Sequence, residues 1–458
     1  MVFLMWWLGL WEGDDEKRKV FREKMRGDKM KRIEKSIFNL LENDKKYKIS
    51  IFIIILLAGV NLWIFRILML LGLFSNPHGG NIWFGDFSVY YNAANLYLDG
   101  ENFYDAGLLY PPLSIIFLLP LGYFTFEQAC FLISLLNLFL LFLIVIIISE
   151  ILQYHGIFLS NIERTLIFIS IFLFYPISTS FVAGQINISI LFLIILSYYY
   201  IFVKGKTTYA SIFLSVATIL KVWPFILIFL NFFHQKAKGL FIKYLSVIGI
   251  LSIASIFLFG FSLHIRFFRT FLNFQKIPIS SPSEVLQPSN AVDTNASPSN
   301  TIFKLLSLFN PPDISPTSIQ LFWTILKIIF VVFLLYYLYK LSRKGEVSSS
   351  AKWGILTFSL LIILVLVASN TTWLYYASFL VLPYILFLFV LKLDVVEKAL
   401  LMVSLILFSI QEHVIFLSNL LGGKIASIVY IAGPTTYAYL LFLILILYSI
   451  RRFETQGK

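Results

Sequence analysis

Residues 85–124 read GDFSVYYNAANLYLDGENFYDAGLLYPPLSIIFLLPLGYF and follow the first long apolar segment of the chain. Between positions 75 and 110 there is no Lys or Arg. The acidic residues in that range are Asp86, Asp99, Glu101 and Asp105. An acid just past a transmembrane helix, followed by an aromatic-rich loop and a Tyr-Pro-Pro sequence, is an unusual combination. We interpret this stretch as part of the active-site entrance of a membrane enzyme, with Asp86 as the catalytic base.

The composition around this stretch is that of a membrane protein. Of 458 residues, 59% are hydrophobic and only 13% are charged, against about 25% charged residues in a soluble domain. Apolar runs of about 20 residues recur from Ile49 to the C-terminus, and each can cross a hydrocarbon core of roughly 30 Å. The runs predict an all-α, polytopic transmembrane bundle of about 10–12 transmembrane or re-entrant helices.

The basic residues indicate how the chain is oriented. The net charge is +12, and residues 1–50 contain 13 Lys or Arg against nine acids. The positive-inside rule and anionic lipid headgroups account for this distribution, which predicts cytoplasmic termini in an integral cell membrane protein. Nucleic acid binding would need a basic soluble face, which the pattern does not provide. A lone cysteine, Cys130, excludes a disulfide framework within one chain.

The same pattern divides the chain into three parts. We expect a charged cytoplasmic segment, a transmembrane domain and a cytoplasmic tail at residues 1–48, 49–450 and 451–458. The first and the long outer loop are placed at residues 75–128 and 263–317. Ten full spans and two broken segments are expected in all.

The two broken segments are predicted from their length and their prolines. Residues 110–124 form an apolar run that is short for a span and contains three prolines, which favours a re-entrant or interfacial segment. Residues 209–233 are interrupted by Lys221-Val-Trp-Pro224 and have basic residues on both flanks, which predicts a hairpin of two short helices. Residues 164–181 and 374–391 are expected to be ordinary spans.

Four polar clusters fall on the outer side of this topology: the Asp86 loop, 184–187 (GQIN), 295–300 (NASPSN) and 369–373 (SNTTW). Helix packing can bring distant loops together on one face, so we expect the clusters to line one cavity. The alternative is that outer loops are polar simply because they contact water.

Several short motifs in this region have the order and spacing of a known family. They are Gly85-Asp-Phe with Tyr90, Gly100 with Tyr104, Tyr110-Pro-Pro-Leu with Pro120, Gly184-Gln-Ile-Asn187, and Leu220-Lys221 with Pro224. The chain resembles glycosyltransferase family 87 of the GT-C superfamily, well over residues 84–233 and loosely over 295–383. The resemblance implies a GT-C-type bundle and a polyprenol-phosphate-mannose-dependent α-mannosyltransferase. The substrate-binding residues that we expect are Tyr90, Tyr110, Gln185, Asn187, Asn295, Trp373, Tyr375 and Tyr376.

The chemistry of such a transfer fits Asp86. A base must take a proton from the attacking hydroxyl group as the anomeric carbon opens. One carboxylate suffices for a single inverting displacement, because no glycosyl-enzyme intermediate forms. The resemblance implies that the family's first-loop Asp has this role, and Asp86 occupies its position. The alternative is that Asp86 caps the N-terminus of a helix over residues 87–98, and the two roles can coexist.

Three basic residues are candidates for binding the lipid phosphate of the donor. Lys221 lies in an apolar stretch, where an ionisable group is costly and is a functional candidate. Arg266 and Arg269 are three residues apart, so one helical face could present both to a phosphate. The alternatives are a snorkelling Lys221 and ordinary headgroup contacts for the two arginines.

One position departs from the family pattern. The family often has a Trp followed by a His near Trp373, whereas this chain has Tyr375 and Tyr376 there. Tyr can donate a hydrogen bond but is a poor base near neutral pH, so Asp86 would carry the base role alone. The five histidines show no metal-ligand spacing, and we expect neither a metal nor another cofactor.

The sequence therefore predicts an integral membrane transferase. It would move a hexose, mannose by resemblance, from a polyprenyl-phosphate donor to a lipid or glycan acceptor at an extracytoplasmic active site. A transporter or flippase of lipid-linked sugar explains the spans and the buried Lys equally well, but not the acidic and aromatic first loop. A structural scaffold would leave the four polar clusters unexplained.

Overall fold

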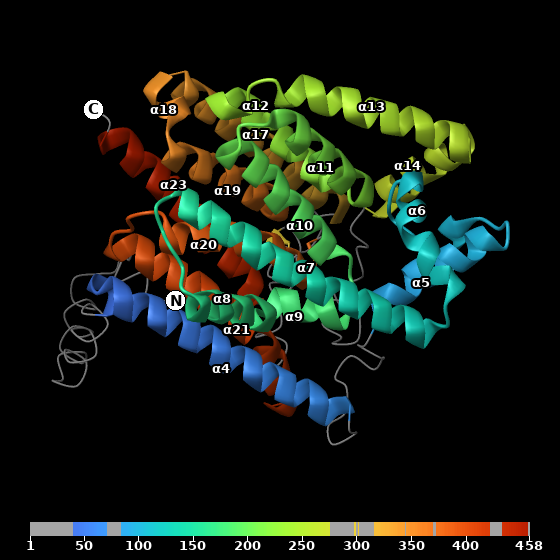
Figure 1. Cartoon of the computed structure of the whole chain (residues 1–458), viewed down its shortest axis with the longest axis horizontal. Coiled ribbons are helices and arrows are strands. Elements are labelled where there is room, and N and C mark those ends of the chain that lie inside the picture. Colours follow the sequence, from blue (N-terminus) through green and yellow to red (C-terminus); the bar gives the residue numbers. More distant parts are fainter. Residues whose placement is uncertain are drawn as a thin grey trace.

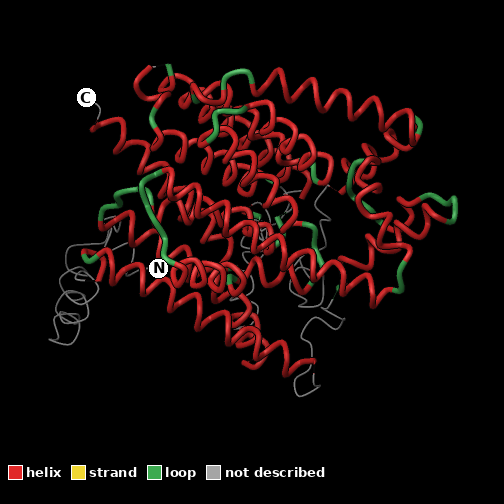
Figure 2. The backbone as a smooth tube through the Cα atoms, in the orientation of Figure 1, coloured by secondary structure: helices red, strands yellow, loops and turns green. Residues whose placement is uncertain are grey.

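The computed structural model describes residues 40–70, 84–274, 297–298, 301, 316–343, 345–369, 372–421 and 433–456. Within these ranges the chain is helical and contains no strand (Figure 2). Among the described residues, six helices are long and apolar enough to cross a membrane, and a bent pair could provide a seventh. The prediction of a polytopic all-α bundle is confirmed.

Figure 1 shows the six helices that are long and apolar enough to cross a membrane. They are α4 (Asp44–Leu70), α7 (Phe126–Tyr154), α13 (Leu240–Phe259), α17 (Pro316–Ser342), α19 (Ala351–Ala368) and α23 (Pro434–Gln456). Helix α19 is apolar on all sides, and 72% of its apolar segment is buried, whereas only 17% of the apolar segment is buried in α13 and in α17. Because α19 is buried and the equally apolar α13 is not, α19 lies in the interior of the bundle and α13 lies on its outside.

The remaining apolar segments are short or bent, and proline explains several of the breaks. Helices α8 (Asn161–Leu173) and α9 (Tyr175–Val182) meet at an angle of 61°, with Pro176 in the first turn of α9. Proline lacks the N–H group that would continue the preceding helix. The segment predicted to span over residues 164–181 is therefore bent near its middle.

The second expected span that proves irregular is residues 374–391. It consists of a 3-10 helix, η8 (Leu374–Leu380), followed by the nine-residue α20 (Val381–Phe389). Residues 112–123 are equally discontinuous, with η2 (Pro112–Ser114), α6 (Ile115–Leu118) and η3 (Leu119–Tyr123) in succession. That short and broken character is what the three prolines of the segment predict.

The hairpin predicted over residues 209–233 is present. Helix α11 (Thr207–Leu220) ends at Lys221, whose backbone is extended. The chain continues as η5 (Trp223–Phe229), with Pro224 in its first turn, and α12 (Leu230–Phe233). Helix α10 (Asn187–Tyr198) packs against α11.

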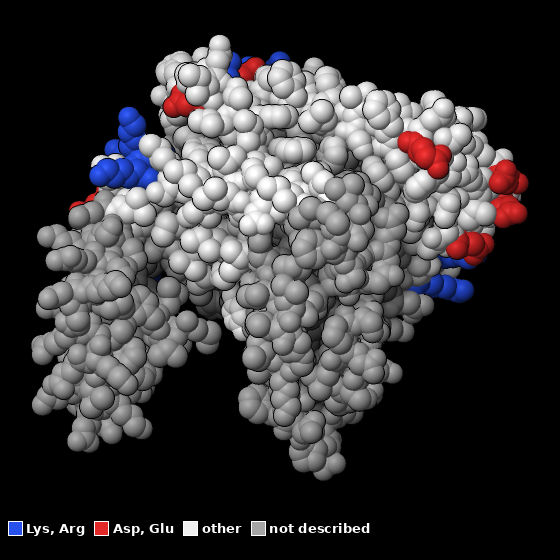
Figure 3. All heavy atoms as spheres, turned by 90° about the horizontal axis from the view of Figure 1, so that it is seen from below, with Lys and Arg blue, Asp and Glu red and all other residues white. Residues whose placement is uncertain are grey.

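Charged side chains are distributed unevenly over the surface. In the view of Figure 3 they lie near the left and right ends and along the upper edge, and the middle of this face shows no charged described residue. Helix α5 (Gly85–Leu98) and α14 (Phe261–Phe274) lie at one end in Figure 1, whereas the last turns of α23 and the first turns of α4 lie toward the other. An apolar belt between polar ends is what a bilayer requires.

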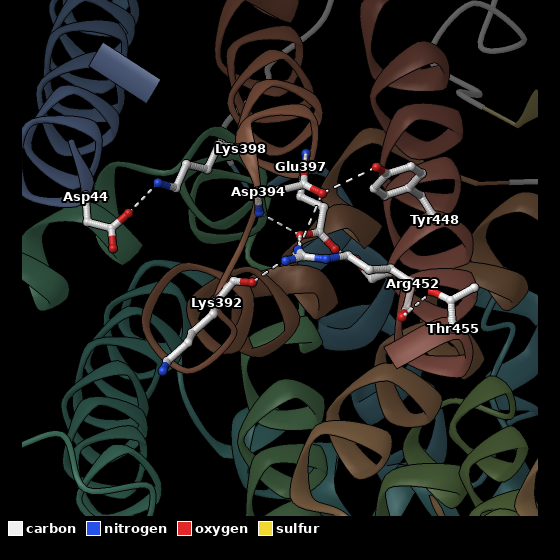
Figure 4. A network of polar contacts seen from close by, with 9 residues as sticks. Asp44, Lys392, Asp394, Glu397, Lys398, Tyr448, Arg452 and Thr455 are labelled. Carbon is white, nitrogen blue, oxygen red and sulfur yellow. Dashed lines mark hydrogen bonds and ion pairs between the residues drawn. The ribbon is translucent and has the colours of Figure 1, made fainter. Parts of the chain in front are cut away.

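The end of the bundle opposite α5 holds a network of ion pairs (Figure 4). The buried Glu397 carboxylate accepts from Arg452 Nη1 at 2.5 Å and from Ser449 Oγ at 2.6 Å. Lys398, which follows it on α21 (Val395–Leu421), pairs with Asp44 of α4. These contacts join α4, α21 and α23, and we refer to them as the inner clamp.

Candidate active site

A cavity of about 650 Å³ lies at the α5 end of the bundle. Eight residues that the sequence analysis predicts for the site contribute to its lining: Asp86, Tyr90, Tyr110, Gln185, Lys221, Trp373, Tyr375 and Tyr376. They come from five separate segments of the chain. Most stand at a helix end or a break, where the backbone leaves the regular helix. Non-helical backbone at membrane depth is tolerated where it lines a cavity or is buried in protein.

Asp86 is the second residue of α5. The N-cap position is held by Phe84, which adopts the left-handed conformation with φ of 57° and donates its N–H to the carbonyl of Val182 at 2.8 Å. The interpretation of Asp86 as the N-cap is therefore wrong. A carboxylate in the first turn of a helix interacts favourably with the helix dipole.

The turn between α9 and α10 brings Gln185 to α5. The N–H groups of Gly184 and Gln185 donate to the carbonyls of Phe181 and Ser180, which is the Schellman arrangement of a helix C-terminus. Gly184 has φ of +65°, and a Cβ there would lie 2.6 Å from Cβ of Phe87. Only glycine allows this approach, so the packing of the turn on α5 requires glycine at position 184.

Gln185 connects Asp86 to three tyrosines. Its Nε2 donates to Asp86 Oδ2 at 2.5 Å and to the Tyr375 hydroxyl at 3.1 Å. Its Oε1 accepts from the Tyr90 hydroxyl at 2.7 Å, and Tyr90 in turn is 2.7 Å from the Tyr110 hydroxyl. Burial raises the pKa of both Tyr90 and Tyr110 above the ordinary value, so both remain protonated near neutral pH.

Lys221 lies on the lining of the same cavity and is 7% exposed. Its Nζ donates to Oδ1 of Asn187 at 2.9 Å and lies 3.9 Å from the centroid of the Tyr376 ring. Both contacts are with neutral groups, and a cation over an aromatic face is attracted to the ring. Lys221 is thus held inside the bundle rather than extended to a membrane interface, in contrast to the snorkelling alternative. Asn187 does not line the cavity, but it accepts the hydrogen bond that holds Lys221 there.

The loop that follows α5 supplies the wall that carries Tyr110. Asn102 caps a short 3-10 helix, η1 (Phe103–Ala106), by accepting from the N–H of Tyr104 at 3.0 Å. The hydroxyl of Tyr104 then donates to the carbonyl of Tyr110 at 2.9 Å. These two bonds fix the backbone that presents Tyr110.

The remaining predicted residues lie elsewhere. Arg266, on α14, pairs with Asp105 at an exposed site, and Arg269 is exposed on the same helix. Neither arginine lines the cavity. Asn295 lies outside the described residues, as do most of residues 295–300. Three of the four predicted polar clusters are therefore brought together, and their convergence is confirmed for those three.

The sequence analysis did not identify the apolar half of the lining. It consists of Val89, Leu109, Val222, Trp223, Phe225, Phe271, Val365, Leu366 and Ala368. Phe271 belongs to the amphipathic helix α14, and its neighbours in the cavity come from α19 and η5. Apolar residues of an apolar chain give no local signal. The only usable indication is that Val222 and Trp223 adjoin Lys221.

The arrangement combines three chemical capabilities in one space: a carboxylate that can accept a proton, an ammonium group that can contact an anion, and aromatic faces with polar edges. Among the described residues, no group of three or more His, Cys, Asp and Glu side chains could hold a metal ion.

Comparison with known proteins adds the family. No curated protein matches the chain. Residues 108–369, more than half of the chain, match glycosyltransferase family 87. The matched range includes Tyr110, Gln185 and Lys221, and it begins after Asp86. The protein is a membrane glycosyltransferase, and the chain belongs to glycosyltransferase family 87.

Proposed function

We propose that the protein transfers a hexose, mannose in the first instance, from a polyprenyl-phosphate donor to a lipid or glycan acceptor. The observation that supports this proposal is one cavity lined by both Asp86 and Lys221, on its polar half, and by a long apolar half. The anionic phosphate would contact Lys221, and the isoprenoid would lie against the apolar half. Asn187 and Tyr376 would hold the Lys221 side chain in place for that contact.

Asp86 acts as the general base in this proposal. The acceptor hydroxyl gives its proton to the Asp86 carboxylate as its oxygen attacks the anomeric carbon. The bond from that carbon to the phosphate oxygen breaks, and polyprenyl phosphate leaves with the electron pair. A single displacement of this kind inverts the anomeric configuration. Charge that develops on the leaving phosphate is stabilised by a fixed cation, which is the role given to Lys221.

The direct test is incubation of the purified protein with labelled polyprenyl-phosphate-mannose and a membrane extract of lipids and glycans. We expect a labelled product whose anomeric configuration is opposite to that of the donor, measured by NMR. Retained configuration, or transfer from a nucleotide sugar alone, would overturn the mechanism. Movement of the labelled donor across a vesicle membrane without transfer would instead support the flippase alternative.

We also propose that the cavity opens on the extracytoplasmic side and that both termini are cytoplasmic. The support is the absence of Lys and Arg from residues 75–110 and their abundance in residues 1–50. The only cysteine, Cys130, is buried, so single cysteines can be introduced as reporters. An impermeant thiol reagent on intact cells should label Glu101→Cys and not Lys206→Cys. The reverse pattern would show that the topology is inverted.

A further inference from the structure

The hydrogen bonds around Gln185 have only one consistent direction. An ionised carboxylate can only accept, so the side of the amide that faces Asp86 must be the NH2 group. The carbonyl then faces Tyr90, whose single hydrogen it accepts. Because the Tyr90 hydrogen is used in this way, the bond between the two tyrosine hydroxyls must run from Tyr110 to Tyr90. The chain of donation therefore runs from Tyr110 through Tyr90 and Gln185 to Asp86.

Both hydrogens of the Gln185 side chain are used in this arrangement. The NH2 group donates them to Asp86 Oδ2 and to the Tyr375 hydroxyl, while the carbonyl accepts from Tyr90. Gln185 is 4% exposed, and its backbone N–H is held by the turn that leads into α10. A buried amide with no hydrogen left to donate is poorly suited to bind a sugar hydroxyl, although the sequence analysis predicts substrate binding for it.

We infer that Gln185 is a positioning residue, which holds Asp86 in its ionised and correctly oriented form, and that Tyr110 and Tyr90 fix the orientation of its amide. Gln185 holds Oδ2 of Asp86, and the Tyr375 hydroxyl, which also contacts Gln185, is a second hydrogen-bond partner of the carboxyl group. Without Tyr90 the amide could rotate and present its carbonyl to Asp86, where two acceptors would repel each other. The catalytic meaning of this arrangement rests on the proposed function, whereas the hydrogen bonds themselves can be tested separately.

The expected effect of replacing Gln185 follows from the hydrogen bond that its amide donates to Asp86. A hydrogen bond donated to a carboxylate favours its ionised form. Loss of the donor makes the carboxyl group retain its proton to higher pH, by about one to two pH units for a bond to a charged group. The titratable and charged side chains within electrostatic range of Asp86 are Tyr90, Tyr110, Lys221, Tyr375 and Tyr376.

The test is an infrared titration of the Asp86 carboxyl group in the full chain. The difference between the spectra of the parent and of Asp86→Asn isolates the band of that group. Gln185→Met keeps the length and volume of the side chain but removes the amide. We expect its titration midpoint to rise by about one to two pH units. The matched control is Gln153→Met, on an exposed face of α7, which should leave the midpoint in place.

Tyr90→Phe provides a second variant that keeps the aromatic packing and removes one hydroxyl group. We expect a smaller rise of the titration midpoint, because the Gln185 amide remains but no longer has the Tyr90 hydroxyl to fix its orientation. Unchanged midpoints in both folded variants would overturn the inference.

Kinetics separate this role from substrate binding. With polyprenyl-phosphate-mannose as donor, Gln185→Met should lower kcat at least about tenfold and shift the acidic limb of kcat to higher pH, with the donor KM nearly unchanged. A raised donor KM with an unchanged pH profile would show that Gln185 binds substrate instead. If Asp86→Asn retains transfer, the proposed base is wrong, and the infrared titration still decides whether Gln185 holds the carboxyl group.

Discussion

The two ends of the bundle each hold oppositely charged side chains, but they do so differently. In the inner clamp, Glu397 is paired with Arg452, and Lys398 with Asp44 (Figure 4). At the cavity, Asp86 and Lys221 are held by the neutral amides of Gln185 and Asn187. Within the described part of the chain, neither of these two charges forms an ion pair.

This difference separates a stabilising cluster from a site. Burying a charge is costly, and a partner of opposite charge reduces the cost. In the inner clamp the partners are part of the protein, so little charge is left for a ligand. An amide can hold a charged group in position without neutralising it. The cavity of about 650 Å³ beside Asp86 and Lys221 leaves room for a substrate to supply the compensating groups.

The largest effect on the rate of sugar transfer is expected at Asp86. Asp86→Asn keeps the shape of the side chain and removes its basicity, so transfer should fall by about 10²- to 10⁴-fold with the fold retained. Turnover and the melting temperature in detergent should be measured together. Asp99→Asn, on an exposed residue at the other end of α5, is the control. Transfer within about threefold of the parent would show that another base operates.

A substitution in the inner clamp should lower stability and leave transfer unchanged, which is the opposite of the result expected at Asp86. Arg452→Met leaves the Glu397 carboxylate buried without its cation, which should lower the free energy of unfolding by about 3 kcal/mol. Transfer per folded molecule should stay at the parent level. The double variant with Glu397→Leu should recover part of the stability, because no buried charge remains. If Arg452→Met lowers turnover and not stability, the distinction between the two regions fails.

A smaller effect is expected at Lys221. Lys221→Met keeps the apolar stem and removes the charge, so the donor KM should rise by about 10- to 150-fold if the ammonium group contacts the lipid phosphate. Part of the loss can appear in kcat, because charge builds on the leaving phosphate. The acceptor KM should not change. The matched control is Lys238→Met at an exposed position. Unchanged donor kinetics would leave Arg266 and Arg269 as the next pair to test.

The smallest effect should come from the exposed edge of the inner clamp. Asp44 is 76% exposed while it pairs with Lys398, and exposed ion pairs contribute about 0–1 kcal/mol. Asp44→Asn should therefore change the free energy of unfolding by less than about 1 kcal/mol, and addition of salt should remove the difference. A loss as large as that of Arg452→Met would mean that this pair is as important as the buried one.

Long apolar runs and the location of polar motifs could be read from the sequence alone. The runs that became α4, α7, α13 and α19 needed only their length and hydropathy, since a bilayer imposes the same requirement on every span. Candidate residues such as Asp86 and Lys221 were also evident, because a charged residue in or beside an apolar run is rare enough to be informative. The bend at Phe174 was harder to predict from the sequence, because Pro176 permits a bend there without requiring it.

Only the tertiary structure decided which of these residues act together. Gly184 and Phe87 are far apart in the sequence, yet their close packing is what places Gln185 against Asp86. The pairing of Arg266 with Asp105 in place of a position on the cavity lining also depends on how α14 packs. Motifs identify residues that can accept, donate or carry charge. The direction of a hydrogen bond and the partner of a charge depend on distances of a few ångströms between segments, which no local pattern specifies.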